Sequence, residues 1–127
     1  MSAADFRPEL LCPAGSPEAM RMAFAYGADA VYAGEPRYSL RVRNNSFTLE
    51  NLGECINEAH QQGKRFYVVV NIAPHNAKLA RFVEHICTIV DMKPDALIVS
   101  DPGVVMLLQQ YFPDQPLHLS VQANTVN

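Results

Sequence analysis

The chain has 127 residues and a formal net charge of −3, with 49% apolar and 18% charged residues. This length predicts one domain with a core of modest size, and the composition is that of an ordinary globular protein. The negative charge excludes a global basic field, so any contact with nucleic acid must come from a local patch. No apolar run reaches the length of about 18 residues that a membrane span needs, and the N-terminus lacks the apolar region of a secretory signal. We therefore expect a cytoplasmic protein.

The three cysteines lie far apart, at Cys12, Cys55 and Cys87, and no C-x-x-C pair is present. This spacing argues against a zinc or iron–sulfur site within the chain, and the odd count fits a reducing compartment. We expect no metal site here.

Short apolar runs alternate with helical patterns along the chain, in the order βαβαβαβαβ. Strands are predicted at residues 9–12, 29–33, 66–70, 96–99 and 117–124. The third of these runs is apolar on both faces, as in a parallel sheet that is covered on both sides. Alternating strands and helices predict a parallel sheet with right-handed crossovers.

Capping residues mark the predicted helix starts. Ser16 precedes Pro17, Thr48 precedes an apolar stripe, and Asp101 precedes Pro102. Such residues accept hydrogen bonds from the free N–H groups of a first turn, and proline is tolerated there. Gly27 and Gly63 are placed to end the first two helices in the left-handed conformation.

The last predicted strand alternates strictly. Its apolar side chains are Leu117, Leu119, Val121 and Ala123, and its polar side chains are His118, Ser120, Gln122 and Asn124. Two architectures compete at this point, a doubly wound open sheet and the first half of a (β/α)₈ barrel. A polar row that faces a barrel mouth favours the barrel, with His118 near the strand start and therefore deeper in it.

A repeat supports this reading, since residues 27–31 (GADAV) and 93–97 (KPDAL) are similar and both lead into a strand. Five strands cannot close a barrel of about eight. We therefore expect residues 1–127 to be the N-terminal part of a TIM-barrel-like catalytic domain. The alternative is that the two open sheet edges pair with a second copy of the chain.

Polar residues follow the predicted strands, and sites in parallel α/β folds gather at such strand ends. The loop of residues 34–47 is rich in guanidinium and amide groups, which hold anionic or planar ligands. The predicted binding residues are Arg41, Arg43, Asn44, Asn45, Asn71, Asn76, Ser120, Gln122 and Asn124. His75 and Asp101 are the candidate catalytic residues. The alternatives are a solvated basic loop, a turn residue at His75 and a helix cap at Asp101.

Several chemistries are disfavoured. The chain lacks the G-x-S-x-G motif of serine hydrolases, the H-E-x-x-H motif of zinc proteases, and the glycine-rich loops that bind nucleotides. Its lysines do not follow strands, which argues against a Schiff-base enzyme.

Six stretches carry a resemblance to a known family: residues 9–16 (ELLCPAGS), 27–34 (GADAVYAG), 38–45 (YSLRVRNN), 70–76 (VNIAPHN), 96–103 (ALIVSDPG) and 118–124 (HLSVQAN). Together they resemble the collagenase-like peptidase family of unknown catalytic type. The resemblance is greatest to the branch that hydroxylates tRNA uridine in a prephenate-dependent reaction, and it covers only the N-terminal part of the usual family length.

The resemblance implies a TIM-barrel-like domain, hydroxylation at C5 of the wobble uridine in tRNA anticodons, and prephenate as co-substrate. It also implies an iron–sulfur cluster in family relatives, held by a cysteine-rich segment that the three cysteines here do not match. Arg41 and Arg43, with Asn44 and Asn45, would suit a small carboxylate or an RNA phosphate. The other two hypotheses are a collagenase-like peptidase and a non-catalytic module that binds tRNA or a carboxylate.

Overall fold

Strands and helices alternate through the part of the chain that the computed structural model describes, which is residues 8–34, 36, 47–70 and 79–120. The strands are β1 (Leu11–Pro13), β2 (Ala30–Gly34), β3 (Arg65–Val69), β4 (Ala96–Val99) and β5 (Leu117–Leu119). The helices are α1 (Pro17–Ala25), α2 (Leu49–Gln61), α3 (Leu79–Asp91) and α4 (Pro102–Tyr111). The predicted order βαβαβαβαβ is confirmed.

The helices begin where the capping residues predict. The Ser16 hydroxyl accepts a hydrogen bond from the Ala19 N–H at 3.0 Å, and Thr48 and Asn51 exchange hydrogen bonds in a capping box. Gly27 and Gly63 follow α1 and α2 with φ of +103° and +73°, a region that side chains disfavour. The first strand differs from the predicted range 9–12, since it spans Leu11–Pro13. Glu9 therefore lies before the strand.

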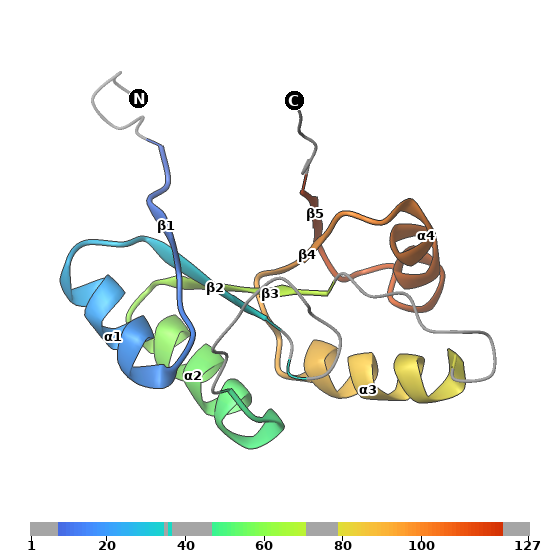
Figure 1. The fold of residues 1–127 in the computed structure, drawn as a ribbon, viewed down its shortest axis with the longest axis horizontal. Helices are drawn as coiled ribbons and strands as arrows, with labels where there is room; N and C mark the ends of the chain where they lie inside the picture. The colour runs from blue at the N-terminus through green and yellow to red at the C-terminus, as the bar shows by residue number, and fades with distance from the viewer. Residues whose placement is uncertain (1–7, 35, 37–46, 71–78, 121–127) are drawn as a thin grey trace.

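All five described strands are parallel and lie in the order β1-β2-β3-β4-β5. One core cluster joins side chains from all four helices to one face of the sheet, including Met20, Ile56, Phe82 and Leu108. A doubly wound sheet would carry helices on both faces and would reverse its strand order. Sequential order with the helices on one side is instead the arrangement of a partial TIM-barrel-like unit (Figure 1).

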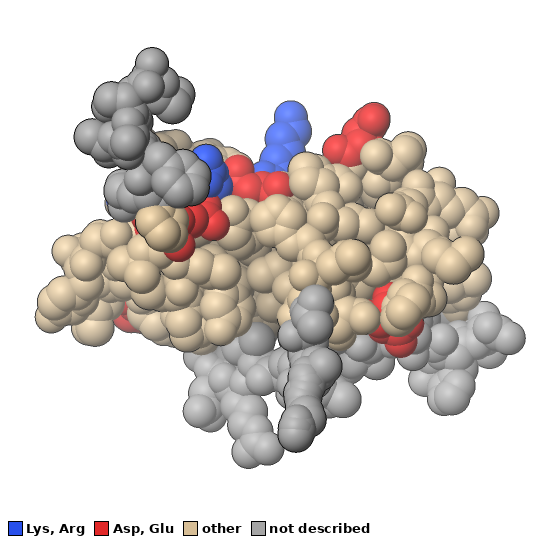
Figure 2. Space-filling view, turned by 90° about the horizontal axis from the view of Figure 1, so that it is seen from above, with Lys and Arg blue, Asp and Glu red and all other residues tan. Residues whose placement is uncertain are grey.

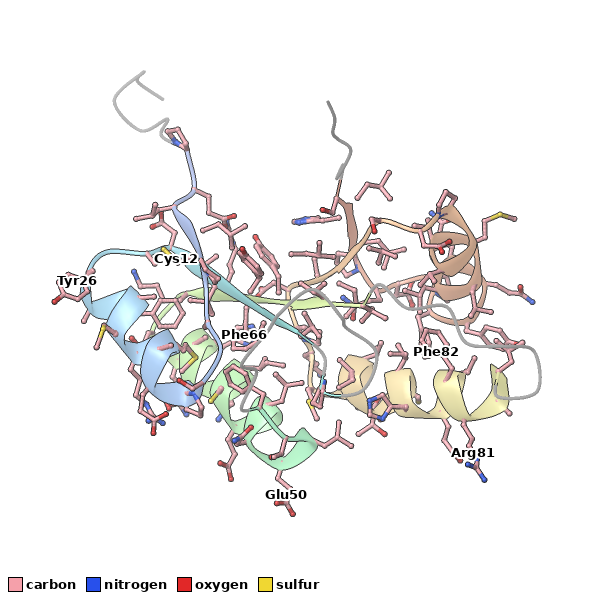
Figure 3. The ribbon with its side chains drawn as sticks, in the orientation of Figure 1. Cys12, Tyr26, Glu50, Phe66, Arg81 and Phe82 are labelled. Atoms are coloured by element: carbon pink, nitrogen blue, oxygen red, sulfur yellow. The ribbon has the colours of Figure 1, made fainter. Side chains whose placement is uncertain are left out.

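The helix-covered face holds most of the apolar core. Phe66 and Phe82 are fully buried, whereas Glu50 and Arg81 point outward from α2 and α3 (Figure 3). The Phe66 ring meets the Phe47 ring edge-on at a centroid distance of 5.8 Å. These contacts fix the helices against the sheet and leave the ends of the strands for other roles.

The opposite face of the sheet, here called the helix-free face, carries a second and smaller cluster. Ala30, Tyr67 and Ala96 are buried there, with Tyr32 and Ile98 packed against them. The Tyr67 and His118 rings, from β3 and β5, lie 5.0 Å apart between centroids. Contacts between alternate strands are typical of the side-chain layers inside a barrel. Seen from the side opposite α1, α2 and α3, the surface is mainly uncharged (Figure 2).

Two aspartates fasten the amino ends of neighbouring strands. The Asp29 carboxylate accepts from the Leu10 N–H at 2.8 Å, and the Asp29 N–H donates to the Leu10 carbonyl. Asp95 does the same with Phe66, also at 2.8 Å. The two aspartates occupy equivalent positions in the repeated segments 27–31 and 93–97, so the repeat has a structural reason.

Within the described residues, no helix is long and apolar enough to cross a membrane. In the same residues β1 and β5 are each paired on one side only. Association of these edges with a second copy stays a prediction.

Candidate functional site

The carboxyl ends of the strands meet at one edge of the sheet. Because neighbouring strands are parallel, β2 ends at Gly34 next to the end of β3 at Val69, and β4 ends at Val99 next to Leu119. The polar segments singled out from the sequence follow these ends. Nine of the predicted site residues lie outside the described residues: Arg41, Arg43, Asn44, Asn45, Asn71, His75, Asn76, Gln122 and Asn124. Their roles stay predictions.

Both anchor points of the arginine-rich loop lie at this edge. Pro36 follows β2, and Phe47 precedes α2; together with Thr48, Leu49, Glu50 and His85 they line a cavity of about 470 Å³. The residue that follows β2 and the residues that start α2 therefore line the same cavity. This places the start and the end of the predicted anion-binding segment beside α3.

Asp101 caps α4. One oxygen of its carboxylate accepts from the Gly103 N–H at 2.7 Å and from the Val104 N–H at 3.3 Å. The alternative reading of Asp101 as a helix cap is thus confirmed. Its half-buried carboxylate also lies at the carboxyl end of β4, so a catalytic role for Asp101 remains a prediction.

Ser120 continues the ladder beyond β5, since its N–H donates to the Val99 carbonyl at 2.8 Å. Side chains alternate along an extended chain, so Ser120 belongs to the same face as His118. This is the helix-free face, because Leu117 packs into the core on the helix side while His118 contacts Tyr67. The two described members of the predicted polar row, His118 and Ser120, therefore face away from the helices, as a barrel-mouth position requires.

The amino ends of the strands hold a network that the sequence did not reveal. Arg65 donates to Glu9 at 2.6 Å, and the Tyr67 hydroxyl donates to the two oxygens of the same carboxylate at 3.0 and 3.1 Å. Burial raises the pKa of Tyr67 above its usual value, and the Glu9 carboxylate raises it further. Glu9 lies 56 residues from Arg65 in the sequence, so no local pattern announces the contact.

A second charged group lies at the same amino edge. His60 and Asp95 approach to 2.8 Å between the imidazole Nε2 and a carboxylate oxygen, which also accepts from the Phe66 N–H. A cavity of about 250 Å³ at this edge is lined by Pro8, Glu9, Asp29, Gly63, Lys64 and Arg65. The charged side chains that line this cavity have both signs and are partly paired with one another. Such a lining fits a structural role better than the binding of an anion.

The cysteines do not form a ligand set. Cys12 is half-buried in β1, Cys55 is buried in α2 and Cys87 is exposed on α3. Burial raises the pKa of the Cys55 thiol, and the nearby Glu58 carboxylate raises it further, so this thiol is poorly suited to bind metal as a thiolate. Among the described residues, no group of three metal-ligating side chains comes together. The thiols present here therefore do not fit an iron–sulfur cluster.

Comparison with known proteins gives a family. Residues 15–127 match peptidase family U32. A tRNA hydroxylation protein P of Escherichia coli K12 is 68% identical over 122 residues, which are 96% of this chain and 27% of the relative. A protein of the same name from Helicobacter pylori 26695 is 45% identical over 94% of this chain and 28% of its own length.

A more distant relative acts on a different RNA. The 23S rRNA 5-hydroxycytidine C2501 synthase of Escherichia coli K12 is 35% identical over 98% of this chain and 18% of its own length. No solved structure matches the chain. The chain spans about a quarter of the length of the tRNA hydroxylation proteins that it matches. Since the family match covers most of the sequence, the chain belongs to peptidase family U32.

Proposed function

We propose that this chain is part of a protein that hydroxylates tRNA. The observation that carries the proposal is the 68% identity to a tRNA hydroxylation protein over 96% of the chain. The relative that is named a 5-hydroxycytidine synthase supports the reaction class, since it also places a hydroxyl group on a pyrimidine of RNA. The reaction proposed here is hydroxylation at C5 of the wobble uridine, with prephenate as co-substrate, in the cytoplasm.

The proposed roles of the residues follow from their positions relative to the sheet. Residues 1–127 supply the N-terminal part of a TIM-barrel-like catalytic domain, and the site lies at the carboxyl edge, where such barrels bind their substrates. Arg41 and Arg43 would pair with a carboxylate of the co-substrate or with an RNA phosphate, and Asn44, Asn45, Asn71 and Asn76 would orient it. His75 and Asp101 are the proposed acid–base groups, and Ser120, Gln122 and Asn124 the polar wall.

An iron–sulfur cluster, which the resemblance implies for family relatives, is not assigned to these cysteines, and no step of the proposal passes through one. A peptidase activity draws support only from names, that of the family and that of a relative called an uncharacterized protease. In the described residues His60 binds Asp95, and neither it nor His118 is paired with a cysteine or serine. Such a pair is what a nucleophilic protease needs.

Deletion of the gene that encodes the chain tests the proposal. Transfer RNA from the deletion strain is digested to nucleosides and analysed by mass spectrometry, in a strain without a redundant hydroxylation pathway. We expect 5-hydroxyuridine and its derivatives to disappear and to return with the wild-type gene on a plasmid. Unchanged nucleosides would refute the function, and release of peptides from gelatin by the pure protein would support the peptidase instead.

A further inference from the structure

The helix-free face carries two polar rings, those of Tyr67 and His118. Branched apolar side chains usually fill the corresponding positions inside a barrel. Tyr67 and His118 lie ring to ring at 5.0 Å, with an angle of 56° between their planes. The Tyr67 hydroxyl is held by Glu9, which is in turn bound by Arg65. Polar groups cost stability inside a protein unless they are paired, so this row of side chains calls for a reason beyond packing.

Tyr67 is held in place by its neighbours, whereas His118 is exposed on the helix-free face. Tyr67 is 5% exposed, and its raised pKa keeps the phenol protonated as a donor to Glu9. His118 is exposed, and among the described residues the ring contact with Tyr67 is the interaction that the structure gives it. One side of the imidazole is therefore supported, and within the described residues no hydrogen bond to its ring nitrogens is seen.

His118 also lies next to the proposed site. It precedes Ser120 by two residues, so the two side chains are neighbours on the same face of an extended chain. Ser120 follows the end of β5 at the carboxyl edge. A ligand that enters from this edge and passes Ser120 reaches His118 next.

The chemistry of this face favours a neutral, planar ligand. Ile98 is the register partner of His118 on β4, and the ring of Tyr67, whose raised pKa keeps it uncharged, lies against the imidazole. The cation of Arg65 is already bound to Glu9 at the amino end. Within the described residues, the neighbours given for His118 offer no cation to a carboxylate. Unstacked bases, in contrast, lie against aromatic and imidazole rings in RNA-binding proteins. Enzymes that modify a base take it out of its stack into such a pocket.

Building on the proposed function, we propose that His118 lines the pocket that receives the flipped uracil base. Its ring edge donates a hydrogen bond to a uracil carbonyl oxygen, and Tyr67, held by Glu9, is a positioning residue behind it. The arginine-rich loop is then left to bind the anionic groups, so base and anion are recognised by different parts of one edge.

Photo-crosslinking tests this assignment on the protein expressed from its own gene at its native length. The probe is an anticodon stem–loop RNA with 5-bromouridine at the wobble position. We expect irradiation to join the RNA to the peptide that contains His118 or to the one that contains Tyr67. A crosslink that maps to any other peptide, or no crosslink although the protein forms hydroxyuridine, would overturn the proposal whatever the stability of the variants.

Variants give a second, independent reading. Hydroxyuridine in tRNA is measured in a deletion strain that carries each variant, and is normalised to the amount of protein. We expect His118→Ala to lower it about tenfold or more, as the loss of one hydrogen bond to the base implies. His118→Gln keeps an N–H donor and should recover most of it. Leu119→Ala is the matched control, because Leu119 is 69% exposed and points to the other face.

The two possible failures are distinct. If the wild-type gene restores no hydroxyuridine, the proposed function fails. If the wild-type gene restores it and His118→Ala restores as much, the function stands and the assignment of His118 is wrong.

Discussion

The two edges of the sheet are built for different purposes. At the amino edge, polar side chains bind neighbouring strands: Asp29 accepts from Leu10, Asp95 from Phe66, and Glu9 from Arg65. At the carboxyl edge, Asp101 follows β4 and Ser120 follows β5, and in the sequence the segments that carry the arginines and amides follow β2, β3 and β5. In TIM-barrel enzymes, residues at the amino ends of the strands mainly stabilise the fold, and residues at the carboxyl ends carry the chemistry. The contrast predicts that substitutions at one edge change folding and at the other change activity.

The largest effect on stability is expected from Asp95→Ala. The substitution removes the acceptor of the Phe66 N–H and the partner of His60. An unpaired N–H in a half-buried place costs about 2 kcal/mol in the free energy of unfolding. Urea unfolding measures it, with the exposed Asp114→Ala as control. Equal unfolding midpoints for the two variants would show that the amino edge does not depend on this contact.

Asp101 offers a test of the opposite edge. Asp101→Ala removes the cap of α4 and should cost about 1 kcal/mol, while Asp101→Ser keeps an acceptor and should cost only a few tenths. Activity separates cap from catalyst. If Asp101 is an acid–base group, Asp101→Ser loses hydroxyuridine formation while the protein stays folded. Full activity of Asp101→Ser would leave Asp101 with its structural role alone.

Lys93 is a place where the amino edge can be improved. It has φ of +61° and occupies the position of Gly27 in the repeated segment. A residue with a side chain pays about 1 kcal/mol for this conformation. Lys93→Gly should therefore raise the thermal unfolding midpoint without a change in activity. Lys64→Gly, at another residue of the amino edge and without positive φ, serves as control and should not raise the unfolding midpoint.

The smallest effect is expected from the ion pair that joins α1 to α2. Arg21 donates to Glu58 at 2.8 and 2.9 Å and lowers the pKa of that carboxyl below its usual value of 4.5. A lowered pKa stabilises the folded state above the usual value, and the gain is lost as the pH falls through the lowered pKa. Arg21→Gln should thus be slightly less stable than wild type at pH 7.

The difference between Arg21→Gln and wild type should vanish in acid, as measured by urea unfolding at several pH values. Because Arg21 is exposed and Glu58 is partly exposed, screening by solvent keeps the gain small even at neutral pH. If Arg21→Gln lowered the free energy of unfolding at pH 7 as much as Asp95→Ala, this surface ion pair would be as important as the amino-edge contacts, and the expectation would be wrong.

Local patterns were sufficient for the elements of the fold. The hydroxyl and carboxylate caps at Ser16, Thr48 and Asp101 act on residues two or three positions away, so the sequence shows them directly. The alternation of residues 117–120 likewise predicted which side chains face away from the helices. The choice of the barrel over the doubly wound sheet needed the strand order, which the alternation only favoured.

Contacts between distant segments were beyond the reach of the sequence. Glu9 was read as part of the first strand, yet it binds Arg65 and Tyr67 at separations of 56 and 58 residues. His118 was expected deep in the barrel and was left out of the site. The contact between His118 and Tyr67 agrees with a position inside the barrel. Only the structure showed that Tyr67 supports the His118 ring, two residues before Ser120. The residues of loop 37–46 and of segments 71–78 and 121–127 remain predictions from sequence.

The central claim, a tRNA site at the carboxyl edge, is tested most directly by one comparison of tRNA nucleosides. A deletion strain carries either Arg41→Ala with Arg43→Ala, or Lys64→Ala with Arg81→Ala, which removes the same charge at the amino edge and on the outer face of α3. We predict that hydroxyuridine is lost with the first pair and kept with the second. Hydroxyuridine kept by both, or lost equally by both, would contradict a site at the carboxyl edge.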